Sequence, residues 1–132
     1  MAKRQNISSG TIWEEMAGYS RAVRIGNHIA VSGTTATDDD GNLVGADDAY
    51  AQTMFIIRKI ERALIEAGAS LDDVVRTRIF ITDISRWEEV TKAHGEVFSD
   101  IRPANTLVGT SGLIGEGYLV EMEADALLID KE

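Results

Sequence analysis

The sequence contains no cysteine and a single proline, and aromatic residues make up only 6% of it. Without cysteine there is no disulfide framework, no thiolate metal site and no thiol nucleophile. This composition fits a reducing compartment, and we expect a cytoplasmic protein. The apolar runs are much shorter than the roughly 20 residues that a membrane span needs. The first ten residues carry a basic pair with no apolar stretch behind it, so we expect neither a secretory signal nor a membrane partner.

Basic residues are also scarce. The chain has 13 Lys and Arg against 22 Asp and Glu, and its formal net charge is −9. A field of this sign repels phosphate backbones, so we expect no nucleic-acid partner. The two histidines, His28 and His94, lie in different predicted elements without the spacing of metal ligands. We therefore expect no metal site.

The 132 residues, 44% of them hydrophobic, are enough for one domain spanning 1–132. Gly26-Asn27 separates two β-prone runs in residues 20–33 and predicts a hairpin. Asp47 or Asp48 is expected to cap a helix that continues to about residue 67, where Gly68 ends it. A second helix is expected over residues 86–99.

Three further strands are predicted, in residues 74–82, 104–111 and 118–129. Alternation in the first of them places Val75, Thr77, Ile79 and Ile81 on one face. The resulting order, β-β-α-β-α-β-β, predicts an α+β fold in which a mixed sheet carries two helices on one face. The other face then mixes apolar and charged side chains, which is typical of a surface that meets other subunits.

Three acidic residues, Glu121, Glu123 and Asp125, alternate along the last predicted strand. They can form cross-strand pairs with Arg76 and Arg78, or a carboxylate among them can orient water near a subunit interface. From the residues alone, Glu121 does not stand out from the other two.

Other candidate residues have simple structural interpretations. The segment Ser32-Gly33 ends a predicted strand and can present a hydroxyl or a backbone N–H, but no nucleophile elbow surrounds it. Tyr19 is expected to be half-buried packing. The glycine-rich SGLIGEG lacks the ending of a phosphate loop and is interpreted as a plain loop or as one that lines a ligand cleft.

Several segments together resemble a known family. They are Gly18-Tyr19, IGNHIAVSG, EAGASLDDVVRTRIFITDI and, most specifically, PANTLVGTSGLIGEGYLVEM at residues 103–122. With these motifs the chain resembles the Rid family of reactive intermediate deaminases, also called the YjgF or L-PSP family, over about residues 15 to 130.

The resemblance implies a chorismate-mutase-like α+β sandwich assembled as a homotrimer, with ligand clefts between neighbouring subunits. It also implies hydrolysis of imines and enamines to a keto acid and ammonia, without metal or cofactor. By motif match, Glu121 is the catalytic residue that holds the water. Tyr19, Ser32 and Gly33 would line the cleft and contact the small-molecule ligand.

One position departs from the family motif. The family arginine that clamps a substrate carboxylate is replaced by Asn105, which is neutral and cannot form a bidentate ion pair. The resemblance therefore implies a divergent member. Its ligand lacks a carboxylate, or Arg102 or another subunit supplies the cation.

Two functions stay open at this point. One is a cofactor-free hydrolase of a small imine, enamine or related carbonyl compound. The other is a non-catalytic trimer that binds or senses a small molecule. A third function known among relatives, endoribonuclease or translation inhibitor, is the least favoured because of the net charge of −9.

Overall fold

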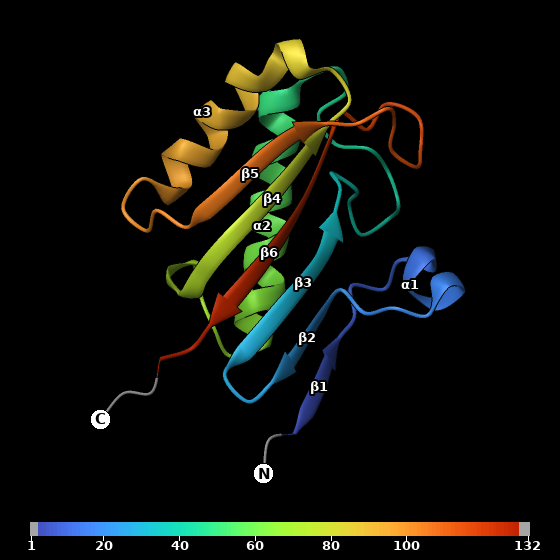
Figure 1. Ribbon diagram of the computed structural model, residues 1–132. Coiled ribbons are helices and arrows are strands. Elements are labelled where there is room, and N and C mark those ends of the chain that lie inside the picture. Colours follow the sequence, from blue (N-terminus) through green and yellow to red (C-terminus); the bar gives the residue numbers. More distant parts are fainter. Residues whose placement is uncertain (1–2, 130–132) are drawn as a thin grey trace.

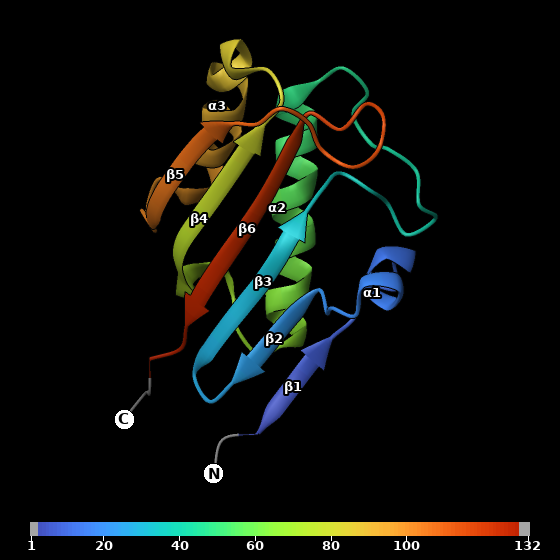
Figure 2. The same ribbon diagram turned by 45° about the vertical axis from the view of Figure 1, so that its right-hand side comes forward.

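The computed structural model describes residues 3–129. Its central element is a six-stranded sheet in the order β1-β2-β3-β6-β4-β5. The strands β4 and β5 are parallel, and all other neighbours are antiparallel. Figures 1 and 2 show α2 and α3 behind one face of the sheet and α1 beyond the end of β1 and β2. The elements are β1 (Arg4–Ile7), α1 (Ile12–Ala17), β2 (Ala22–Ile25), β3 (His28–Thr34), α2 (Ala49–Glu66), β4 (Val74–Ile81), α3 (Trp87–Phe98), β5 (Ala104–Gly109) and β6 (Val120–Leu127), with short 3-10 turns at Leu71–Asp73 and Ile84–Arg86.

The predicted α+β class, with a mixed sheet and two helices on one face, is confirmed. The structure adds β1 and α1 ahead of the predicted order. Strand β1 pairs with β2 from Arg4↔Ile25 to Ile7↔Ala22, and only Ile7 of its residues is buried. A four-residue strand with one buried side chain has no alternation to detect, so the sequence pattern does not indicate it.

The helix α2 begins and ends at the signals that the sequence predicts. The Asp48 carboxylate accepts a hydrogen bond from the backbone N–H of Ala51 at 2.9 Å, and Gly68 follows the helix with φ of 91°. The apolar stripe of α2 packs on β3 and β6, and its fully buried large side chains are Ile56, Ile57, Ile60 and Leu64. This packing makes α2 a rigid platform behind the middle of the sheet.

The predicted face of Val75 is wrong. Val75 is 48% exposed, whereas Val74 is 3% exposed and pairs with Ala126. The register between β4 and β6 shifts between Val74 and Arg76, which is the geometry of a β-bulge. One extra residue at the start of β4 reverses the alternation there, and the inward pattern resumes at Thr77.

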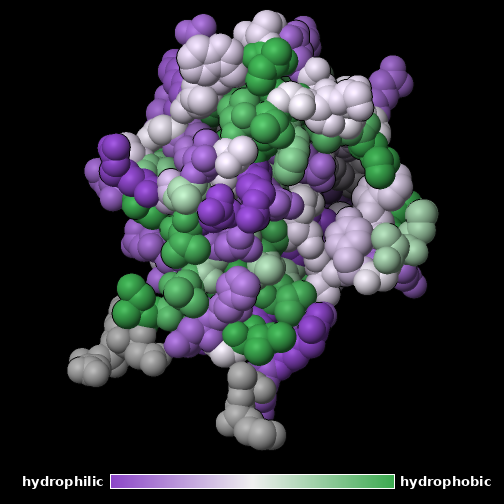
Figure 3. All heavy atoms as spheres, viewed as in Figure 1, coloured by the Kyte–Doolittle hydropathy of each residue, from purple (hydrophilic) through white to green (hydrophobic). Residues whose placement is uncertain are grey.

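The sheet face opposite the helices carries the predicted charge pairs. The Arg78 guanidinium lies 3.2 Å from a carboxylate oxygen of Glu123 and 3.2 Å from one of Asp125. This confirms cross-strand pairing for Glu123 and Asp125. Glu121 does not take part in these ion pairs with Arg78. Figure 3 shows this face, with hydrophilic side chains over the middle of the sheet and hydrophobic ones around them. No helix in residues 3–129 is long and apolar enough to cross a membrane.

Candidate functional site

A pocket of about 110 Å³ lies where β3 ends, between the α1 segment and the N-terminal half of β6. It brings together three of the residues that the sequence predicts for the site, namely Tyr19, Gly33 and Glu121. It also contains groups that the sequence did not indicate, which are the cations Arg21 and Lys59 and the hydroxyls of Thr11, Thr35 and Thr37. A carboxylate, two cations and several hydroxyls therefore surround one small space.

The Glu121 carboxylate lies directly against the backbone of β3. A Cβ atom added at Gly33 would be 2.7 Å from Oε2 of Glu121 and 3.0 Å from its Cδ, so only glycine allows this approach. The β3–β6 register shifts between Val31 and Thr34, which brings this glycine opposite the carboxylate. Burial raises the pKa of Glu121, an effect that the nearby Arg21 charge partly offsets and that Glu123 reinforces.

Arg21 is a buried cation at the base of the pocket, with 4% of its surface exposed. Its Nη1 donates to the carbonyl oxygen of Gly33 at 2.6 Å and to Oγ1 of Thr34 at 3.0 Å. Its Nη2 lies 3.5 Å from the Tyr19 hydroxyl, and its guanidinium carbon lies 5.6 Å from the centroid of the Tyr19 ring. Arg21 thus fixes the backbone of Gly33, against which the Glu121 carboxylate lies.

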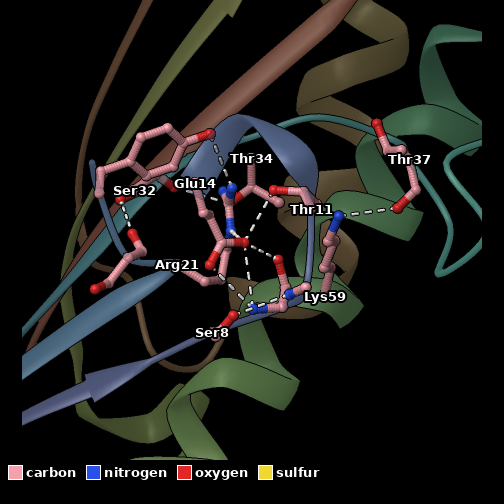
Figure 4. A network of polar contacts seen from close by, with 12 residues as sticks. Ser8, Thr11, Glu14, Arg21, Ser32, Thr34, Thr37 and Lys59 are labelled. Carbon is pink, nitrogen blue, oxygen red and sulfur yellow. Dashed lines mark hydrogen bonds and ion pairs between the residues drawn. The ribbon is translucent and has the colours of Figure 1, made fainter. Parts of the chain in front are cut away.

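A buried acid from α1 balances this arginine. Oε2 of Glu14 lies 3.8 Å from Nε of Arg21, and the same carboxylate accepts hydrogen bonds from the Ser9 N–H at 3.2 Å and the Thr11 hydroxyl at 3.0 Å. Burial alone would raise the pKa of Glu14, but the hydrogen bonds from Ser9 and Thr11 and the Arg21 charge hold it below its usual value. The pair joins the N-terminal segment to the wall of the pocket (Figure 4).

Lys59 reaches the pocket from the middle of α2. Its ammonium donates to the backbone carbonyl of Thr37 at 2.9 Å, as Figure 4 shows. Burial lowers the pKa of Lys59, and the like charge of Arg21 lowers it further. No sequence pattern indicates Lys59, because it lies between buried positions of an amphipathic helix, where a charged side chain usually faces solvent.

Two of the predicted site residues, Ser32 and Asn105, do not line the pocket of the single chain. The Ser32 hydroxyl donates to the Ser20 carbonyl at 2.6 Å and does not line the pocket. Asn105 is on the edge strand β5, and its side-chain amide donates to Oγ1 of Thr77 at 2.9 Å. The same Thr77 oxygen lies 2.8 Å from Nε2 of His94, so the Asn105 side chain is held toward its own helix layer.

The alternative cation, Arg102, is exposed in the turn between α3 and β5, where its φ is 56°. It does not line the Glu121 pocket. Within residues 3–129, no three His, Cys, Asp or Glu side chains are grouped so that they could hold a metal ion.

Comparisons with known proteins place this chain in a family. Residues 12–128 match the family described as Endoribonuclease L-PSP. A Mycobacterium tuberculosis structure, a member of the highly conserved YjgF/YER057c/UK114 family, is 50% identical with a TM-score of 0.87, covering 96% of this chain and 100% of that chain. The structure of the Rid protein YyfA from Yersinia pestis is 30% identical with a TM-score of 0.84, covering 96% and 100%. The chain belongs to the Rid family.

Membership of the Rid family confirms the predicted resemblance and the predicted fold. One Rid relative, the 3-aminoacrylate deaminase RutC of Acinetobacter baylyi, is 32% identical over 111 residues, which is 84% of this chain and 87% of RutC. Its name describes deamination of an enamine that carries a carboxylate. At the level of the Rid family, the comparisons therefore support imine deamination.

Proposed function

We propose that this Rid-family protein hydrolyses a small imine or enamine without a cofactor, using Glu121 to orient a water molecule and accept its proton. The observation that carries the proposal is the half-buried Glu121 carboxylate held against Gly33 in a pocket of about 110 Å³. A carboxylate whose pKa is raised by burial is a stronger base than an exposed one. The pocket size suits a substrate of a few heavy atoms.

The proposed reaction needs only proton transfers and one addition. An enamine first gains a proton on carbon and loses one from nitrogen, which gives the imine. The water oxygen then bonds to the imine carbon while one water proton passes to Glu121, and the imine nitrogen takes a proton from solvent, which gives a carbinolamine. Glu121 returns its proton to the amine nitrogen, the hydroxyl loses its proton to solvent, and the C–N bond breaks with its electron pair on nitrogen, so ammonia leaves and a carbonyl group remains. Holding the water and substrate together is the main contribution of such a site.

The test is the release of ammonia and keto acid from imines that an amino-acid oxidase generates in the same solution. Purified protein is expected to accelerate the release above the spontaneous rate. If it does not do so with imines of several side-chain sizes, the alternative, a non-catalytic small-molecule-binding trimer, replaces the hydrolase. Asn105 at the family arginine position is the observation that favours this alternative.

A homotrimer is part of the proposal. The open sheet face combines the Arg78 pairs with exposed apolar groups such as Val75, and the helices cover only the opposite face. Contact between three such faces would bury them, and the exposed edge strand β5 would bring Asn105 to a neighbouring subunit. We expect light scattering to give a mass near three times 14.4 kDa. A stable monomer would contradict the trimer.

The net negative charge of the chain argues against an RNA substrate. With a net charge of −9, repulsion from phosphates should prevent tight binding at physiological salt. We expect fluorescence anisotropy with labelled single-stranded RNA to show no binding at micromolar protein. Submicromolar affinity that weakens with salt would contradict this prediction.

A further inference from the structure

We propose that Lys59 is the residue that binds the substrate carboxylate in the Glu121 pocket. The inference rests on the proposed function and adds the residue that selects the substrate. It also gives a reason why the chain can function with Asn105 at the family arginine position, because the cation comes from α2 of the same subunit.

The ammonium of Lys59 has unused binding capacity. It carries three N–H donors, and the Thr37 carbonyl accepts one of them at 2.9 Å. None of the ion pairs found in residues 3–129 includes Lys59. The nearby Asp39, which acts on the Lys59 charge, pairs with Arg62 at 3.4 Å. A partly buried cation without an ion-pair partner, on the wall of a pocket, is suited to an anionic ligand.

Arg21 is less suited to contact the ligand, because its side chain is buried and its terminal nitrogens already make three hydrogen bonds to protein groups. Its two terminal nitrogens donate to Gly33, Thr34 and Tyr19. Its Nε is buried without a hydrogen-bond partner and faces Glu14 at 3.8 Å. Arg21 therefore contributes positive charge to the pocket, while Lys59 offers the free N–H groups. The repulsion between these two cations would be relieved by an anion bound at Lys59.

The charges also suggest how the substrate lies. Arg21 lies near both groups, because its charge acts on the pKa of Lys59 and on that of Glu121. Lys59 enters the pocket from α2 and Glu121 enters it from β6. A small substrate can then place its carboxylate at Lys59 and its imine carbon at the water held by Glu121. An anion bound next to Glu121 itself would be repelled.

Binding of pyruvate, a keto acid of the product class, tests the proposal without requiring catalysis. Titration of the isotope-labelled full-length protein with pyruvate, followed by amide NMR, is expected to shift the Gly33 N–H with saturation. Lys59→Met should weaken pyruvate about tenfold or more, the effect of losing a charge-assisted contact. Lys59→Arg should retain most of the affinity. The neutral pyruvamide should bind more weakly than pyruvate to the wild type and equally to all variants.

The control variant is Lys92→Met, which removes one exposed lysine on α3 over the Tyr50 ring. It should bind pyruvate like the wild type. The proposal is overturned if Lys59→Met binds pyruvate as well as the wild type does, or if wild type binds no pyruvate or binds pyruvamide equally. Pyruvate binding through Lys59 without imine hydrolysis would overturn the proposed function alone. Hydrolysis with unchanged activity in Lys59→Met would overturn only the role of Lys59.

Discussion

Replacing Glu121 by glutamine is expected to slow imine hydrolysis about a hundredfold or more. A positioned general base typically contributes a factor of about 10² to 10⁴, which corresponds to about 2.7 kcal/mol or more of transition-state stabilisation. Glutamine keeps the shape and can still contact the water, but it cannot take a proton. The measurement is the initial rate of keto acid release at matched concentrations of wild type and variant.

Glu123→Gln is the matched control, because it removes one carboxylate from the same strand, next to Arg78 and outside the pocket. It should retain most of the activity, since Asp125 still pairs with the arginine. Equal activity of Glu121→Gln and wild type would exclude Glu121 as the base. Equal loss in both variants would indicate a general effect of charge or assembly.

Glu121→Gln should also change the free energy of unfolding, in the direction expected for a buried glutamate. Because burial raises its pKa, the folded protein binds more protons than the unfolded chain between the usual glutamate pKa and the raised value. The ionised side chain therefore lowers the free energy of unfolding at neutral pH. Glu121→Gln should be more stable than wild type to urea at pH 7, and this difference should disappear below the usual glutamate pKa.

Gly33→Ala is expected to produce a large loss of activity in a folded protein. The added methyl would lie 2.7 Å from Oε2 of Glu121, well inside van der Waals contact, while the glycine itself lacks a positive φ. The flexible carboxylate should move rather than the backbone, so the free energy of unfolding should change by only about 1 kcal/mol. Displacement of a catalytic group by about 1 Å typically costs a hundredfold in rate.

Gly112→Ala is the control for this substitution. Gly112 has no positive φ, and a Cβ added there meets no atom within 4 Å. Its rate and thermal midpoint should match those of wild type. If Gly33→Ala were fully active, the Glu121 carboxylate would not need its position against β3, and the proposed water site would be wrong.

The sequence predicted the parts of the fold that local signals determine. The Gly26-Asn27 hairpin, the Asp48 cap and the buried alternation of β6 depend on turn chemistry and period, which short windows contain. The exposure of Val75 was not predictable in this way. A β-bulge is a property of the pairing between β4 and β6, and the isolated β4 sequence alternates without interruption.

The candidate site was predictable only where family motifs covered it. Tyr19, Gly33 and Glu121 come together as expected, but the motif gave no orientation for the Ser32 hydroxyl, which binds Ser20. Arg21 and Lys59 were missed because burial of a charged side chain depends on tertiary partners. Arg21 is buried by Glu14 and Gly33, and Lys59 by the loop carrying Thr37.

The position of β6 has a consequence for synthesis of the chain. Among the elements of residues 3–129 this strand is synthesised last, yet it lies in the middle of the sheet, between β3 and β4. Until Val120–Leu127 emerges, β3 and β4 have no common neighbour and the apolar side of α2 lacks much of its cover. The complete sheet can therefore form only after β6 has emerged, and its formation is expected to be slow for this size, because pairings such as Ile29↔Ala126 join distant parts of the chain. During that interval the nascent chain presents two unpaired strand edges, which is the stage most exposed to aggregation.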